Sequence, residues 1–91
     1  MANTAPQTLS IQQAIDLGLN HHNAGELAQA KNVYERILQV EPEHPVVLHL
    51  LGVVAHQMDQ NEIAFNLITK AVTIQPDYVE AHSNLGLVLD Q

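Results

Sequence analysis

The sequence predicts an all-α solenoid of antiparallel helix pairs, with about five helices in the chain. Two observations predict this fold class. Gly18, Gly52 and Gly86 are separated by intervals of 34 residues, and the same interval relates Pro42 to Pro76. Within each interval apolar residues recur with helical spacing, and no segment alternates in the manner of a β-strand. Repetition at this period is typical of proteins in which each unit packs on its neighbours.

Composition narrows the classes of function. The chain has 91 residues, enough for one small domain. Ten acidic against three basic residues give a formal net charge of −7, which disfavours nucleic acid and anionic membrane surfaces because both require clustered cations. No apolar run approaches the roughly 18–20 residues of a membrane span, and the N-terminus lacks the features of a signal peptide. The sequence contains no cysteine, so disulfides and thiol catalysis are excluded, and we expect a cytoplasmic protein.

Two full units and a fragment make up the predicted domain. The full units comprise about residues 11–44 and 45–78, and a partial unit follows at 79–91. Together they form one domain of residues 11–91. Residues 1–10 are polar, and we expect them to form a flexible lead.

The first unit is predicted to form helices at about residues 11–23 and 26–40. Ser10, followed three residues later by Gln13, is a capping box that starts the first helix. Gly25 lies in the break between the two helices, where it can adopt the left-handed conformation that ends a helix.

The second unit is predicted to form helices at about residues 45–57 and 60–74. Pro45 suits the first position of a helix. Pro76 ends the second helix, as its equivalent does in the first unit, because the residue before a proline is kept out of the helical region. The apolar stripes of the two helices are Leu48, Leu51, Gly52 and Ala55, and Ala64, Leu67, Ile68, Ala71 and Val72.

The partial unit is predicted to form one helix at about residues 79–90. Asp77, followed three residues later by Glu80, fits a second capping box. Leu85 and Leu89 lie on the stripe that should pack against a second helix of the same unit. We therefore expect the chain to be cut from a longer array, or this edge to serve self-association.

A period of 34 residues with a Leu-Gly pair, a small residue in the second helix and a closing proline resembles the tetratricopeptide repeat. The matching residues are Leu17-Gly18, Leu51-Gly52, Leu85-Gly86, Ala30, Ala64, Tyr34, Pro42 and Pro76. The resemblance covers residues 11–91 and implies a right-handed superhelix of antiparallel helix pairs. The sequence departs from the family's larger or aromatic residues at Ala14, Leu48, His82, His21, Ala55, Leu89 and Ile68.

The repeated glycines indicate a close approach of two helices. Glycine inside a helix costs about 1 kcal/mol relative to alanine, so three glycines at one register need a reason. We expect Gly18, Gly52 and Gly86 to lie at matching crossings between the two helices of each unit.

The first helix of each unit also has a flank that should face the preceding unit. The flank residues are Gln13 and Asn20 in the first unit, Val47 and Val54 in the second, and Ala81 and Val88 in the third. A polar flank in the first unit alone is typical of the outer cap of a solenoid. We therefore expect a genuine end of the array at the N-terminal side.

Neither a metal site nor catalysis is predicted. The chain has six histidines, but His49 and His56 lie seven residues apart. That spacing is about 10 Å along a helix axis, too far for one shared ion. His21 and His22 point in different directions. The two serines lack the glycine-rich elbow of a hydrolase, and there is no phosphate-binding loop. We expect no cofactor.

In the family that the sequence resembles, first helices line a concave groove and second helices form its back. The resemblance therefore implies a peptide groove lined by Gln12, Ile15, Leu19, His22, Asn23, Val46, His49, Val53, His56, Gln57, Glu80, Ser83, Asn84 and Leu87. Apolar residues edged with amide and imidazole groups suit an extended or helical peptide. Alternatively, these are tolerated surface residues. Lys31, Arg36 and Lys70 fall on second helices, so the family's basic clamp for a C-terminal carboxylate is not expected.

Two functions remain open. The first is a protein–protein interaction module that binds a protein or peptide partner. The alternative is an N-terminal arm that recruits substrate or oligomerises within a larger enzyme, such as a glycosyltransferase or methyltransferase. The run Asn84-Leu85-Gly86 resembles repeats that precede O-linked glycosyltransferase domains. A longer reading frame with a catalytic domain would decide between them.

Overall fold

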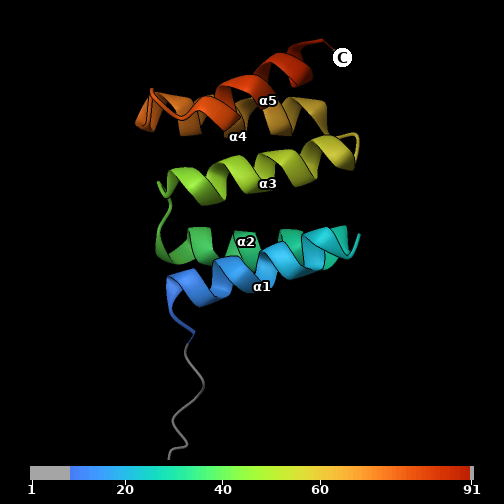
Figure 1. The fold of residues 1–91 in the computed structure, drawn as a ribbon, viewed down its shortest axis with the longest axis vertical. Helices are drawn as coiled ribbons and strands as arrows, with labels where there is room; N and C mark the ends of the chain where they lie inside the picture. The colour runs from blue at the N-terminus through green and yellow to red at the C-terminus, as the bar shows by residue number, and fades with distance from the viewer. Residues whose placement is uncertain (1–8, 91) are drawn as a thin grey trace, which may run out of the picture.

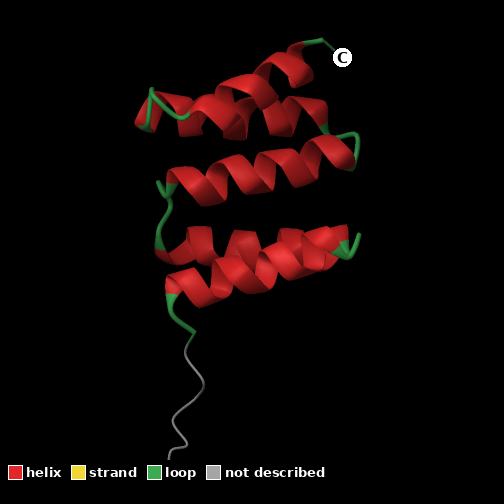
Figure 2. Ribbon diagram, in the orientation of Figure 1, coloured by secondary structure: helices red, strands yellow, loops and turns green. Residues whose placement is uncertain are grey.

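The computed structural model describes residues 9–90 and forms five α-helices. They are α1 (Ile11–Asn23), α2 (Leu27–Val40), α3 (Pro45–Gln57), α4 (Asn61–Ile74) and α5 (Val79–Leu89). Short loops join them, and no strand occurs within residues 9–90 (Figure 2). The predicted all-α fold is confirmed, with each helix end within one residue of its expected place. Most of the lead that we expected to be flexible, residues 1–8, lies outside the described residues.

The helices stack along the longest axis of the molecule, whose extents are 52 × 26 × 18 Å. Figure 1 shows α1, α3 and α5 one above another on the side nearer the viewer, with α2 and α4 behind them. Helix α1 packs against α2, and α3 against α4; α2 also packs on α3, and α4 on α5. Each pair of helices is therefore joined to the next by the second helix of the earlier pair.

Local signals in the sequence set most helix ends. Ser10 Oγ accepts a hydrogen bond from the Gln13 backbone N–H at 3.0 Å, and Gln13 Oε1 accepts one from the Ser10 N–H at 2.9 Å. The predicted capping box is thus confirmed. Gly25 has a φ of 80°, as its place between two helices requires. Asp59, at the equivalent place in the second unit, has a φ of 61°.

The second predicted capping box is wrong. Helix α5 begins at Val79, so its N-cap is Tyr78, whose side chain makes no capping hydrogen bond. Asp77 therefore lies one residue before the cap. Glu80 occupies the second helical position instead of the third, which the motif requires.

Two of the three glycines lie at the predicted crossings. A Cβ on Gly18 would meet Tyr34 Cε1 at 2.4 Å, and a Cβ on Gly52 would meet Ile68 Cγ1 at 2.4 Å. Tyr34 and Ile68 are fully buried on α2 and α4. At Gly86 the expectation of a matching crossing is wrong: the described residues place nothing within 4 Å, because no second helix stands opposite α5.

The flanks of α3 and α5 form the seams between units. Val47 and Val54 are 0% exposed, and Val54 belongs to the same buried cluster as Tyr34 of the first unit. Ala81 and Val88 are buried in a second cluster with residues of α3 and α4. Gln13 and Asn20, at the same register in α1, are exposed. The polar flank therefore faces outward, as its residues predict.

Candidate interaction surfaces

The fourteen residues predicted to line a groove all fall on α1, α3 and α5. These three helices lie on the same side of the stack (Figure 1). We call the surface they form the first-helix face. It carries the predicted mixture of apolar, amide and imidazole side chains.

Two imidazole–amide bridges connect neighbouring helices of this face. His22 Nε2 lies 2.7 Å from Gln57 Oε1, which joins α1 to α3. The Asn84 amide nitrogen lies 2.7 Å from His49 Nε2, which joins α3 to α5. The partners in each bridge are 35 positions apart, about one repeat. The structure thus brings four predicted residues together in pairs.

His49 is the most buried polar side chain of the face, at 6% exposure. Its Nε2 accepts from the Asn84 amide, so the neutral ring carries its hydrogen on Nδ1, which donates to Tyr78 Oη at 3.0 Å. The two rings also meet edge to face, with centroids 4.9 Å apart. Burial lowers the pKa of His49, and the nearby Glu80 carboxylate offsets part of that effect. His49 is therefore a neutral link between α3 and α5.

The remaining predicted residues differ in how much of their side chain is exposed. Ile15 is only 4% exposed and, like His49, lies beneath the surface and offers little area to a ligand. His56 Nδ1 bonds Asn61 Oδ1 at 3.0 Å and thereby ties α3 to the start of α4. Exposed residues are Gln12, Asn23, Gln57, Glu80, Ser83 and Leu87, and half-buried ones are Leu19, His22, Val46, Val53, His56 and Asn84.

The charges of the face are few. Glu80 is the single acidic residue among the fourteen, and none is Lys or Arg. The three cations of the chain, Lys31, Arg36 and Lys70, lie on α2 and α4. Within residues 9–90, no three His, Asp or Glu side chains are gathered in a way that could hold a metal ion.

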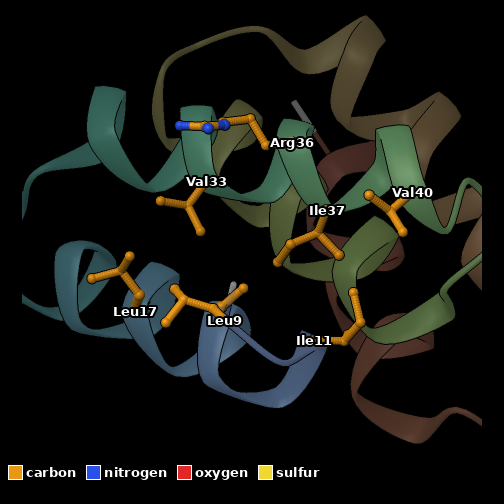
Figure 3. A pocket seen from close by; sticks show the side chains of 8 residues that line it. Leu9, Ile11, Leu17, Val33, Arg36, Ile37 and Val40 are labelled. Carbon is orange, nitrogen blue, oxygen red and sulfur yellow. The ribbon is translucent and has the colours of Figure 1, made fainter. Parts of the chain in front are cut away.

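The structure also shows a surface that sequence reasoning missed. A hollow of about 340 Å³ opens between α1 and α2 on the outer side of the first unit. We call it the outer hollow; it is lined by Leu9, Ile11, Ala14, Leu17, Val33, Arg36, Ile37 and Val40. Figure 3 shows the apolar side chains of α1 and Leu9 facing those of α2, with Arg36 beside them. The sequence signal was the apolar Leu17 beside the polar flank of α1.

Comparison with known proteins identifies the family. A sequence profile of the tetratricopeptide repeat matches residues 14–44 and 46–78, which is most of the chain. The chain belongs to the tetratricopeptide repeat family. Its repeats are therefore those of a protein–protein interaction module, a class that is typically non-enzymatic. No helix within residues 9–90 is long and apolar enough to cross a membrane.

Solved structures confirm the helical solenoid. Two crystal structures of MamA align with TM-scores of 0.83 and 0.82, each at 20% sequence identity and over 89% of this chain. The alignments cover 47% and 44% of those chains, so this tetratricopeptide chain spans less than half of their length. At this identity the likeness concerns the fold.

Proposed function

We propose that the first-helix face binds a peptide segment of a partner protein. The observation that carries the proposal is the pair of imidazole–amide bridges, which hold α1, α3 and α5 in one register. Half-buried Leu19, Val46 and Val53 lie on the same helices. A face whose side chains already hold one another loses less conformational entropy when a ligand binds.

The charges favour a neutral or basic peptide. The face carries Glu80 and neither Lys nor Arg, and the whole chain has a formal net charge of −7. A ligand recognised through a carboxylate would find no Lys or Arg on these helices and would be repelled by the overall field. A segment with apolar anchors and uncharged or basic side chains is complementary to both features.

The test is selection of peptides from a displayed random library against the 91-residue chain, followed by titration of the selected peptides with variants. Ser83→Arg and Leu87→Arg change exposed positions on the face, whereas Asn66→Arg changes an exposed position on α4. We expect the two face variants to weaken binding at least about tenfold and the α4 variant to leave it unchanged. Equal binding to all three would refute the proposal.

The edge formed by Leu85 and Leu89 is proposed as a site of self-association. Leu89 is 63% exposed, and the described residues leave open space beside Gly86. A second copy could bring a helix close at that glycine. Light scattering over a range of concentrations tests this role: a strict monomer for the parent chain would refute it, and Leu89→Asp should remove any association.

A larger protein that contains this chain could use the same faces to recruit a substrate to a catalytic domain. A longer reading frame that includes a catalytic domain would support it.

A further inference from the structure

We propose that the outer hollow is a second binding surface, separate from the first-helix face, and that it accepts an amphipathic α-helix from a partner protein. The helix would lie against the first repeat in the way that α2 lies against the second.

In the second repeat, a helix of the preceding unit covers the face that is open in the first repeat. Leu17 of α1 has the register of Leu51 of α3, yet Leu17 is 39% exposed and Leu51 is 6% exposed. The difference arises because α2 packs on α3: Leu51 belongs to the same buried cluster as Ala30, Tyr34 and Ile37 of α2. At the register of Leu17, within the described residues, no helix fulfils that role.

The second helices of the two repeats show the same difference in exposure. Val40 on α2 is 72% exposed, whereas Ile74, its equivalent on α4, is 38% exposed. Where Leu51 meets Leu67 in the second repeat, the remaining gap is about 90 Å³, and part of its wall is made by α2. Leu51 and Leu67 have the register of Leu17 and Val33, which line the open hollow of about 340 Å³ in the first repeat. The fold therefore fills this place with a helix wherever an earlier unit supplies one.

Gln13 and Asn20 make the outer hollow suited to a helix that binds reversibly. Gln13 and Asn20 are exposed on α1 at the register of Val47 and Val54, which α2 covers completely. A helix in the hollow would bury its apolar stripe against Leu17 and α2 while its edge meets two amides. Amides need polar partners when they are covered, so the docked helix carries polar residues along that edge.

The charge at the hollow specifies the helix further. Arg36 lies at the hollow, is exposed, and makes no ion pair with the carboxylates that the structure describes. A carboxylate on the docked helix would pair with it. The chain's own residues 1–8 do not have the required pattern, since Met1 is their one large apolar residue and Pro6 interrupts a helix. The favoured occupant is thus a partner helix with an apolar stripe and an acidic residue beside it.

The probe for this proposal is a synthetic peptide of residues 26–42, because α2 is the helix that covers the equivalent face inside the fold. It is labelled and titrated with the full 91-residue chain by fluorescence anisotropy. We expect saturable binding that Leu17→Asp or Val40→Asp weakens at least about tenfold. We expect the double change Gln13→Val with Asn20→Val to tighten it, since these restore the valines of the second repeat.

Three controls separate the occupants. Val79→Asp changes an α5 side chain that is 72% exposed, as Val40 is, near the other end of the stack and should leave binding unchanged; loss of binding there and not at Leu17→Asp would overturn the proposal. Deletion of residues 1–8 should also leave it unchanged, and an increase of about tenfold would make the chain's own lead the occupant instead. Concentration-dependent dimers of the parent that Leu17→Asp abolishes would assign the hollow to a second copy. Absence of binding even to the double valine variant would equally refute a helix acceptor.

Discussion

Replacing Gly52 by alanine tests the helix crossing directly. The new Cβ would lie 2.4 Å from Ile68 Cγ1 and 3.4 Å from the Ala64 carbonyl oxygen. Ordinary carbon contacts are about 3.5 Å, so the fully buried Ile68 must move by about 1 Å. Such overpacking costs about 3 kcal/mol at the upper end of its usual range, and alanine recovers about 1 kcal/mol of helix propensity. We therefore expect Gly52→Ala to lower the free energy of unfolding by about 2 kcal/mol.

Gly86 provides the matched control, because it has the same register and a Cβ placed on it would meet none of the described residues within 4 Å. Gly86→Ala therefore gains helix propensity without a clash. We expect it to stabilise α5 by up to about 1 kcal/mol. The two substitutions are chemically identical and should have effects of opposite sign.

Thermal unfolding followed by circular dichroism measures both variants. For a chain of this size about 1 kcal/mol corresponds to about 4–8 °C in Tm, so Gly52→Ala should melt about 8–16 °C lower than the parent. Gly86→Ala should melt at the same temperature or higher. If Gly52→Ala proves as stable as the parent, or if Gly86→Ala is as damaging as Gly52→Ala, the steric account of these glycines is wrong.

Three further outcomes are expected. The Tyr34 hydroxyl is buried without a hydrogen-bond partner and burial raises its pKa to about 12, so Tyr34→Phe should keep or raise the free energy of unfolding in urea, by up to about 1 kcal/mol. Burial lowers the pKa of folded His49 from 6.5, so the unfolded chain takes up that proton first and stability falls as pH drops below this value. Urea unfolding at pH 7.5 and 5.5 should show a smaller loss of stability in His49→Gln than in the parent; an equal loss in both would contradict the role of His49. Val54→Asn buries an amide in the α2–α3 seam and should lower the free energy of unfolding by about 2–4 kcal/mol. Asn20→Val, at the same register of α1, should change it by no more than about 0.5 kcal/mol. Equal effects of the two variants in urea unfolding would contradict the assigned seam.

Several helix bounds could be predicted because a residue with a strong local effect marks them. Gly25 tolerates the positive φ that ends α1, Pro45 fixes φ at the first position of α3, and Ser10 with Gln13 forms a reciprocal pair of hydrogen bonds. The motif at Asp77 failed because a spacing of three residues does not by itself determine where a helix starts.

The features of the site that were missed depend on contacts between distant segments. The burial of His49 is caused by Tyr78 and Asn84, which lie 29 and 35 positions away. Repeat periodicity placed His49 on α3, but it carried no information on those partners. The outer hollow was not predicted for a similar reason, since its lining combines Leu9 with residues of both α1 and α2.

The stacking of the helices determines how the molecule would respond to a pulling force. Tension applied between α1 and α5 acts along the 52 Å axis and so across the seams, while each helix lies across that direction. The seam under α5 is held by Ala81, Val88 and the side-chain links of His49, whereas the α2–α3 seam contains large fully buried residues. Stretching should therefore detach α5 first, at low force, and leave the first four helices assembled.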